Sequence, residues 1–322
     1  MDILYFIIQQ TLPVAIPLMI VALAGMFSEK SGTVNIALES IMMIGAFFGV
    51  LTFSIVMKLN INQQLIVIIG MIISGVFGLL FSLLLAYAAI NMKSDQTIIG
   101  TAMNMLVPAL ILLVSKMFFG GDGVYNPEAS VYILEVPLLS KIPLLGDLFF
   151  KKTYITVYIG LAIYIVATIF LNKTKFGLRM RACGEHPQAA DSVGVNVKKM
   201  RYLGVMMSGL LAGVGGFFYA IGVTNSGING YNGVAGYGFL AIAVMIFGQW
   251  KSSKVFFAAL FFAFMQILGT SARLIPGLRE LNLPSVYYTM LPYVVTLIVL
   301  MFTSKSSKAP KAAGQIYDVS KR

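Results

Sequence analysis

Residues 173–202 have the sequence KTKFGLRMRACGEHPQAADSVGVNVKKMRY, and they form the longest strongly polar interval between the apolar segments of this chain. Seven Lys and Arg residues lie in this interval, together with the only Cys and the only His of the chain, Cys183 and His186. Long apolar runs flank the interval on both sides. It is therefore typical of a water-facing loop between two membrane spans.

The composition of the chain indicates a membrane protein. Of its 322 residues, 58% are hydrophobic and only 11% are charged, whereas a soluble domain has roughly 25% charged residues. We therefore predict an all-α, polytopic helical membrane protein in contact with membrane lipid. The net charge of +11 does not indicate a nucleic-acid partner, because Lys and Arg collect in the cytoplasmic loops of membrane proteins.

The apolar runs predict about nine spans, with a range of eight to ten, at ~20 residues per crossing. The run near 236–250 is short, and the run near 34–57 begins with polar residues, so both predict broken or re-entrant helices. We expect one transmembrane domain over 1–303, with its main polar loop at 172–201, and a disordered tail over 304–322. The nine runs lie near 3–27, 34–57, 64–90, 97–119, 153–171, 202–222, 236–250, 255–275 and 286–303.

The basic residues predict the orientation in the membrane. If the 172–201 loop is cytoplasmic and the spans alternate, more than twice as many Lys and Arg residues lie inside as outside, in agreement with the positive-inside rule. The C-terminus is then cytoplasmic and the N-terminus is outside. The first residues, MDILYFII, lack a basic region and a small-residue cleavage site, so we interpret them as part of a first span.

The longest loop on the outer side is 120–152, which mixes Gly and Pro with apolar residues. This pattern indicates a short amphipathic piece at the membrane interface. A lid or spacer without chemistry is the favoured interpretation. A docking surface for a solute-binding protein is the alternative.

The middle of the 172–201 loop, Glu185 to Gly194, predicts a short helix. Pro187 suits a first helical turn, where its missing N–H costs nothing, and Gly194 suits the residue that ends a helix. A helix of this kind can offer its small residues, Ala189 and Ala190, to a groove on a partner protein.

The loop resembles the cytoplasmic coupling loop of ATP-binding-cassette importer permeases, which carries Glu-Ala-Ala followed at a distance by Gly. The matching positions here are Glu185, Ala189, Ala190 and Gly194. The flanking residues resemble the branch of that family that imports simple sugars and nucleosides, and so do two further stretches. The resemblance covers roughly residues 10–300. The matching stretches are 176–182, 195–197, 28–39 and 236–243.

This resemblance implies a permease subunit of an ATP-driven importer in the plasma membrane of a bacterium, with nucleosides or a related simple sugar as the solute. It implies three partners: a cytoplasmic ATPase, a second homologous permease chain in a heterodimer, and an extracytoplasmic solute-binding lipoprotein. It implies no catalytic residue, cofactor or metal in this subunit. The chain has no GxxxxGK[ST] stretch, so the energy has to come from the ATPase partner.

Three polar residues inside the predicted spans are candidates for the substrate pathway. Asn35 and Glu39 are four residues apart and share a helix face. They either line the path, or Glu39 is bound to a neighbouring helix or to a backbone N–H as a structural group. Asn104 follows Thr97 and Thr101 at helical spacing, and interhelical hydrogen bonding is slightly favoured there over lining of the path.

Glycines and other small residues have two different meanings in these spans. The stretches 32–37 and 236–243 each place glycines just before a small-residue helix start, and paired interruptions of this kind indicate a transport path. Small residues along the sixth span predict close helix packing instead: Gly204, Ser208, Ala212, Gly215 and Gly216.

Two other classes of protein remain as alternatives. An ion-gradient-driven secondary transporter needs paired ionisable groups in the membrane, and Glu39 has no evident basic partner. A membrane-embedded enzyme needs an acid–base or metal constellation. Cys183 and His186 lie three residues apart on a loop that implies no buried pocket, so nucleophilic or metal chemistry is disfavoured.

Overall fold

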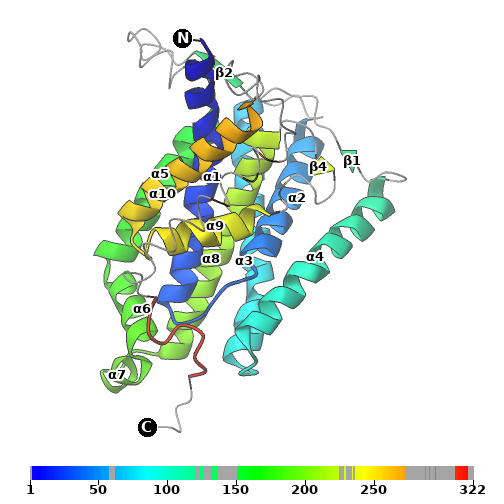
Figure 1. Ribbon diagram of the computed structural model, residues 1–322. Coiled ribbons are helices and arrows are strands. Elements are labelled where there is room, and N and C mark those ends of the chain that lie inside the picture. Colours follow the sequence, from blue (N-terminus) through cyan, green and yellow to red (C-terminus); the bar gives the residue numbers. More distant parts are fainter. Residues whose placement is uncertain are drawn as a thin grey trace.

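A computed structural model describes residues 2–57, 62–119, 151–224, 236–272 and 309–317, together with the short pieces 124–125, 132–135 and 228–229 and the single residues 234, 287, 290 and 294. The described part of the chain is a helical bundle (Figure 1). Its helices are α1 (Asp2–Lys30), α2 (Leu38–Met57), α3 (Gln63–Ile90), α4 (Gln96–Phe119), α5 (Ile155–Lys173), α6 (Lys175–Glu185), α7 (Pro187–Ser192), α8 (Val197–Tyr219), α9 (Tyr237–Phe247) and α10 (Ser252–Thr270).

Seven of the described helices are long and apolar enough to cross a membrane: α1, α2, α3, α4, α5, α8 and α10. The predicted all-helical, polytopic class is thus confirmed, and the first six predicted runs each coincide with one of these helices. The run expected near 286–303 lies almost wholly outside the described residues.

Both predicted interruptions are present. The chain leaves α1 at Lys30 and enters α2 only at Leu38, so residues 31–37 are not helical. Helix α9 has 11 residues, which gives a length of about 16 Å at ~1.5 Å per residue, about half of a bilayer core. It lies across α1 instead of running beside it (Figure 1).

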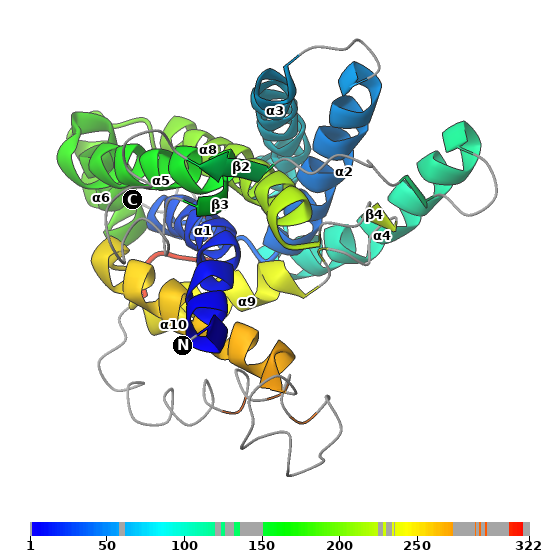
Figure 2. The same ribbon diagram turned by 90° about the horizontal axis from the view of Figure 1, so that it is seen from above.

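Helices α1 and α8 form the centre of the bundle (Figure 2). Helix α8 packs on α1, α2 and α3, and small residues bring the backbones together. A Cβ at Gly216 would collide with the carbonyl of Met42, and one at Gly215 would collide with the side chain of Val21. The predicted close packing of this span is therefore confirmed. A π-helical turn, η3 (Ala220–Thr224), continues α8.

The outward faces of the peripheral helices are apolar, as contact with lipid requires. Helix α4 leans away from the bundle at its edge (Figures 1 and 2). Large apolar side chains are exposed along α3, α4 and α5, including Leu80, Leu84, Met105, Met117 and Val166.

The two ends of the bundle differ. Helices α6 and α7 and the C-terminus lie at one end, and the N-terminus and the short strands lie at the other (Figure 1). The strands form two antiparallel pairs, β1 (Val124–Tyr125) with β4 (Ile228–Asn229) and β2 (Tyr132–Glu135) with β3 (Lys151–Tyr154). The described parts of the 120–152 loop are thus extended, and the amphipathic piece expected elsewhere in it lies outside the described residues.

Candidate functional site

The two interrupted helices meet through Glu39, which lies in the first turn of α2. Its carboxylate accepts hydrogen bonds from the backbone N–H groups of Gly236 (2.5 Å), Gly238 (2.7 Å) and Phe239 (3.3 Å). These groups form the start of α9, where the partial positive charge of a helix N-terminus favours an anion. The buried Glu39 carboxylate therefore caps α9, as the structural interpretation of this residue requires.

The start of α9 depends on backbone geometry as well as on Glu39. Gly236 has φ = 90°, a left-handed conformation that side-chain-bearing residues rarely adopt. With this conformation the Gly236 and Gly238 N–H groups both reach the Glu39 carboxylate. The start of α2 and the start of α9 thus lie against each other in space.

Asn104 of α4 holds the start of α2. Its Oδ1 accepts a hydrogen bond from the N–H of Ser40 (3.0 Å), and its Nδ2 donates to the carbonyl of Ile36 (2.9 Å). One amide therefore satisfies a donor and an acceptor that the interrupted helix leaves free. This is the interhelical hydrogen bonding that was slightly favoured from the sequence.

Asn35 lies within the 31–37 interruption and is buried. Its Nδ2 donates to the hydroxyl of Ser208 on α8 (2.9 Å), and its Oδ1 has no hydrogen-bond partner among the described residues. The structure thus brings Asn35, Glu39 and Asn104 together around one non-helical segment, each connected to a different helix. Of the three, Asn35 has the unused acceptor.

The polar loop between α5 and α8 contains two helices, not the single helix expected over Glu185–Gly194. Glu185 is the last residue of α6, and α7 begins at Pro187, in the predicted first turn. Gly194 has φ = 82° and follows the end of α7, as predicted. The helix α6 was missed because Gly177 and four charged residues dilute its helical pattern.

The two alanines of α7 face opposite ways. Ala189 is exposed. Ala190 is only 4% exposed and packs with Cys183, Val197 and Met200. The Ala190 side chain faces the protein interior, so of the two alanines only Ala189 is exposed to a partner.

Two large apolar side chains of this loop are exposed, namely Leu178 on α6 (61%) and Val193 just after α7 (77%). With Ala189 they are the exposed apolar residues of this loop, and we call this set the docking face. Leu178 and Val193 were missed from the sequence, although an apolar residue in an otherwise polar, water-facing loop is a signal that could have identified them.

Residues 309–317, which we call the C-terminal strap, pack against α6, α7 and the start of α8. The N–H of Ala312 donates to the carbonyl of Gly184 (2.8 Å), and Nη1 of Arg201 donates to the carbonyl of Gln315 (2.8 Å). The ring of Tyr317 lies 5.8 Å from the Arg201 guanidinium carbon and also contacts the cluster that holds Ala190. Arg201 is only 2% exposed, and a buried guanidinium requires acceptors such as the strap carbonyl.

Cys183 is fully buried in this cluster, and burial raises the pKa of its thiol to about 11. The thiol therefore stays protonated near neutral pH, where only the thiolate is a strong nucleophile. His186 is exposed and immediately precedes α7. The described residues contain no group of three His, Cys, Asp or Glu side chains that could hold a metal ion.

A further contact that the sequence did not indicate involves the only Trp of the chain. Nε1–H of Trp250 donates to Oε2 of Glu29 at 2.6 Å. This bond ties the end of α9 to the end of α1, so both ends of α9 are held by buried carboxylates of the 28–39 stretch.

Comparison with known proteins places this architecture in a family. Over residues 7–301 the chain matches the family model described as "Branched-chain amino acid transport system / permease component". It is 40% identical to the guanosine ABC transporter permease protein NupQ of Bacillus subtilis (strain 168), over 100% of this chain and 99% of that protein. No solved structure shows a significant match.

Two proteins of Lactococcus lactis subsp. cremoris (strain MG1363) are also similar. The nucleoside ABC transporter permease protein NupC is 39% identical over 99% of this chain and 98% of that protein. The nucleoside ABC transporter permease protein NupB is 24% identical over 92% of this chain and 78% of that protein. Membership of this family implies an ATPase and a solute-binding protein as partners, and the subunit itself is not catalytic. This chain is a multi-pass membrane protein and belongs to the permease-component family of branched-chain-amino-acid-type transport systems.

Proposed function

We propose that this chain is the membrane-spanning permease subunit of an ATP-driven importer of nucleosides. The full-length similarity to two permeases named for guanosine and nucleosides carries the proposal, at 40% and 39% identity. A related simple sugar is the second solute class, as the resemblance in sequence implies. The absence of a P-loop motif in the chain supports an external source of energy.

The proposed coupling element is the α6–α7 loop, with Glu185, Ala189, Ala190 and Gly194 in different roles. Ala189 contacts the ATPase directly, together with Leu178 and Val193 of the docking face. Ala190 anchors α7 to the cluster beneath it, and Gly194 turns the chain from α7 back towards α8. Glu185 ends α6 at the junction of the two helices.

The proposed substrate path passes the junction of α2 and α9. Asn35 contributes the unused Oδ1 as an acceptor for the N–H and O–H groups of a nucleoside. Glu39 and Asn104 shape the path by holding the two interrupted helices. Discontinuous helices that meet near the middle of the membrane are the usual construction of transport sites.

We further propose a heterodimer with a second, homologous permease chain. In support, Lactococcus lactis has two different proteins named as nucleoside ABC transporter permeases, and this chain resembles them at 39% and 24% identity. A solute-binding lipoprotein delivers the nucleoside on the outer face of a bacterial plasma membrane. The α6–α7 end of the bundle and the C-terminus are then cytoplasmic.

Uptake of labelled guanosine into cells that express the complete transporter tests the function. We expect saturable uptake that unlabelled nucleosides inhibit, and that is lost when the P-loop lysine of the ATPase subunit is replaced. Uptake that persists with the inactive ATPase but collapses with a protonophore would contradict the ATP-driven mechanism. Uptake of glucose instead of guanosine would contradict the proposed solute.

A further inference from the structure

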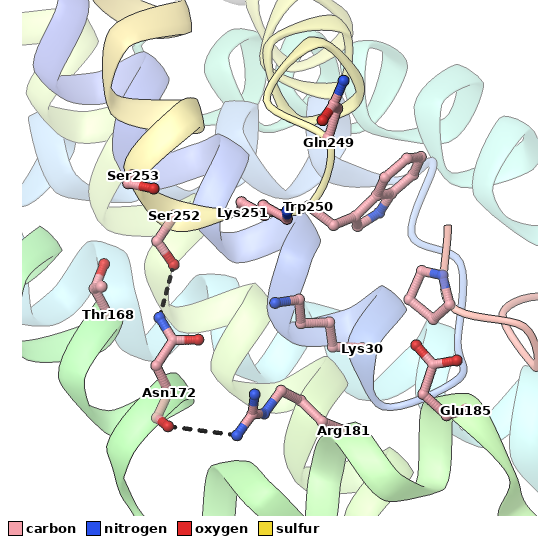
Figure 3. Close-up of a pocket in the computed structure, with 11 residues that line it drawn as sticks. Lys30, Thr168, Asn172, Arg181, Glu185, Gln249, Trp250, Lys251, Ser252 and Ser253 are labelled. Carbon is pink, nitrogen blue, oxygen red and sulfur yellow. Dashed lines mark hydrogen bonds between the residues drawn. The ribbon is translucent and has the colours of Figure 1, made fainter. Parts of the chain in front are cut away.

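A cavity of about 600 Å³ lies at the α6–α7 end of the bundle and is not part of the proposed substrate path. It is bounded by the end of α1, by α5, α6 and the turn between α9 and α10, and by the beginning of the C-terminal strap. Figure 3 shows the side chains around it.

Cationic groups dominate this cavity. Lys30, Arg181 and Lys251 line it, whereas Glu185 is the one carboxylate among its lining residues. Figure 3 shows the Lys30 ammonium and the Arg181 guanidinium directed towards the side where Asn172 lies, and the Glu185 carboxylate on the other side. Arg181 is poorly satisfied, because its hydrogen bond to the carbonyl of Asn172 is long (3.4 Å) and its buried Nε has no partner among the described residues.

The start of α10 adds backbone donors to this cationic surface. Helix α10 has 19 residues, and its N-cap, Lys251, makes no side-chain capping hydrogen bond. The hydroxyl of Ser252 at the first position accepts a bond from Asn172 Nδ2 (3.0 Å). The positive end of an uncapped helix beside Lys and Arg side chains is a favourable place for a phosphate group.

A separate apolar groove lies further along α1, α5 and α10, which also border the cavity or begin at it. It has a volume of about 590 Å³ and is lined by residues of α1, α5 and α10, among them Leu161, Phe256 and Leu260. On α5, Tyr164 lies between Leu161 of the groove and Thr168 of the cavity, and its hydroxyl donates to the carbonyl of Ser252 (2.6 Å). A basic cavity at one end of the bundle, with an apolar groove about two turns further along α5, has the polarity of a phospholipid.

We propose that the cavity binds the phosphate of an anionic phospholipid and that the groove holds one of its acyl chains. Basic pockets between membrane helices on the cytoplasmic side are suited to acidic lipid head groups. Free phosphate shares the head-group chemistry but has nothing to place in the groove. Lipid at this position connects α6, which leads to the docking face, with α10.

The test uses the complete, delipidated transporter in detergent, and native mass spectrometry measures bound phosphatidylglycerol and phosphatidylcholine. We expect the wild type to bind phosphatidylglycerol in preference to phosphatidylcholine. The double variant Arg181→Gln/Lys251→Gln should bind phosphatidylglycerol at least tenfold more weakly. The matched control is Lys175→Gln/Arg179→Gln, which removes the same two kinds of charge from exposed positions on α6 outside the cavity, and it should bind like the wild type.

Two further measurements separate the sources of phosphate and guard against misfolding. Leu161→Trp fills the groove at an exposed position and should weaken phosphatidylglycerol binding without changing the binding of labelled inorganic phosphate in equilibrium dialysis. Lys251→Arg keeps the charge and should retain the lipid. Equal phosphatidylglycerol binding by the wild type and the double variant, or an equal loss in the control, would overturn the site. Saturable phosphate binding without retained lipid would assign the cavity to a free anion and overturn the lipid.

Discussion

At the scale of single residues, Glu39 shows how a buried charge can be a structural group. Its carboxylate serves three backbone donors of α9, 197 and more positions away in the sequence. The carboxylate stays in a bundle interior because those donors compensate for the loss of water. Any effect of Glu39 on transport therefore has to be separated from its effect on the position of α9.

We predict that Glu39→Gln lowers the free energy of unfolding by about 2 kcal/mol, since hydrogen bonds to a charged acceptor contribute ~1.5–3 kcal/mol. The Gln amide nitrogen would also face backbone N–H groups, from which it cannot accept a hydrogen bond. The thermal unfolding temperature and nucleoside uptake should decrease together. Reduced uptake with unchanged thermal stability would instead show that the charge contacts the solute.

Neighbouring alanines of α7 provide a second residue-scale prediction. Ala189→Arg alters the exposed docking face, so the permease should reach the membrane with unchanged thermal stability and lose co-purifying ATPase at least tenfold. Ala190→Arg forces a long charged side chain into a packed cluster, which we expect to lower thermal stability as well. If Ala189→Arg retains wild-type ATPase, the docking face is not the coupling contact.

At the scale of elements, the C-terminal strap ties the coupling helices to α8. Arg201 lies near the start of α8. It contacts the strap through one hydrogen bond to the carbonyl of Gln315 and a cation–π contact with the ring of Tyr317. A desolvated cation–π contact contributes about 2 kcal/mol. Because Ala190 packs in the same cluster, the strap fixes the position of α7 relative to the membrane helices.

We predict that Tyr317→Ala, or a stop after Lys308, leaves membrane insertion intact but reduces nucleoside uptake and ATPase co-purification severalfold. Ile316→Ala is the matched control, because Ile316 is an exposed neighbour in the same strap and its removal should change neither measurement. Full uptake by the chain that ends at Lys308 would show that the strap does not hold the coupling helices.

At the scale of the whole molecule, the basic residues and the fold agree on two distinct ends. Residues 173–202, which hold seven basic residues and include α6 and α7, lie at the same end as the C-terminal strap, opposite the start of α1 (Figure 1). We predict that a reporter active only in the cytoplasm is active when fused after Arg322 and inactive when inserted in the 120–152 loop. The reverse pattern would invert the entire orientation.

Much of this protein follows from local sequence patterns. The long apolar runs predicted the membrane helices, the polar run in 28–39 and the short run near 236–250 predicted the two interruptions, and Pro187 and Gly194 predicted both ends of α7. These features depend on neighbouring residues, through hydrophobic length, helix propensity and backbone conformation. For that reason a single sequence is sufficient to predict them.

Only the tertiary structure decided which groups these elements bring together. It placed Glu39 on the start of α9, turned Ala189 outward and Ala190 inward, and packed the strap around Arg201. Spacing along the chain does not encode the Glu39 and Arg201 contacts, because each joins residues more than 100 positions apart. Each forms because a buried charge, donor or apolar surface has to find a partner in the folded protein.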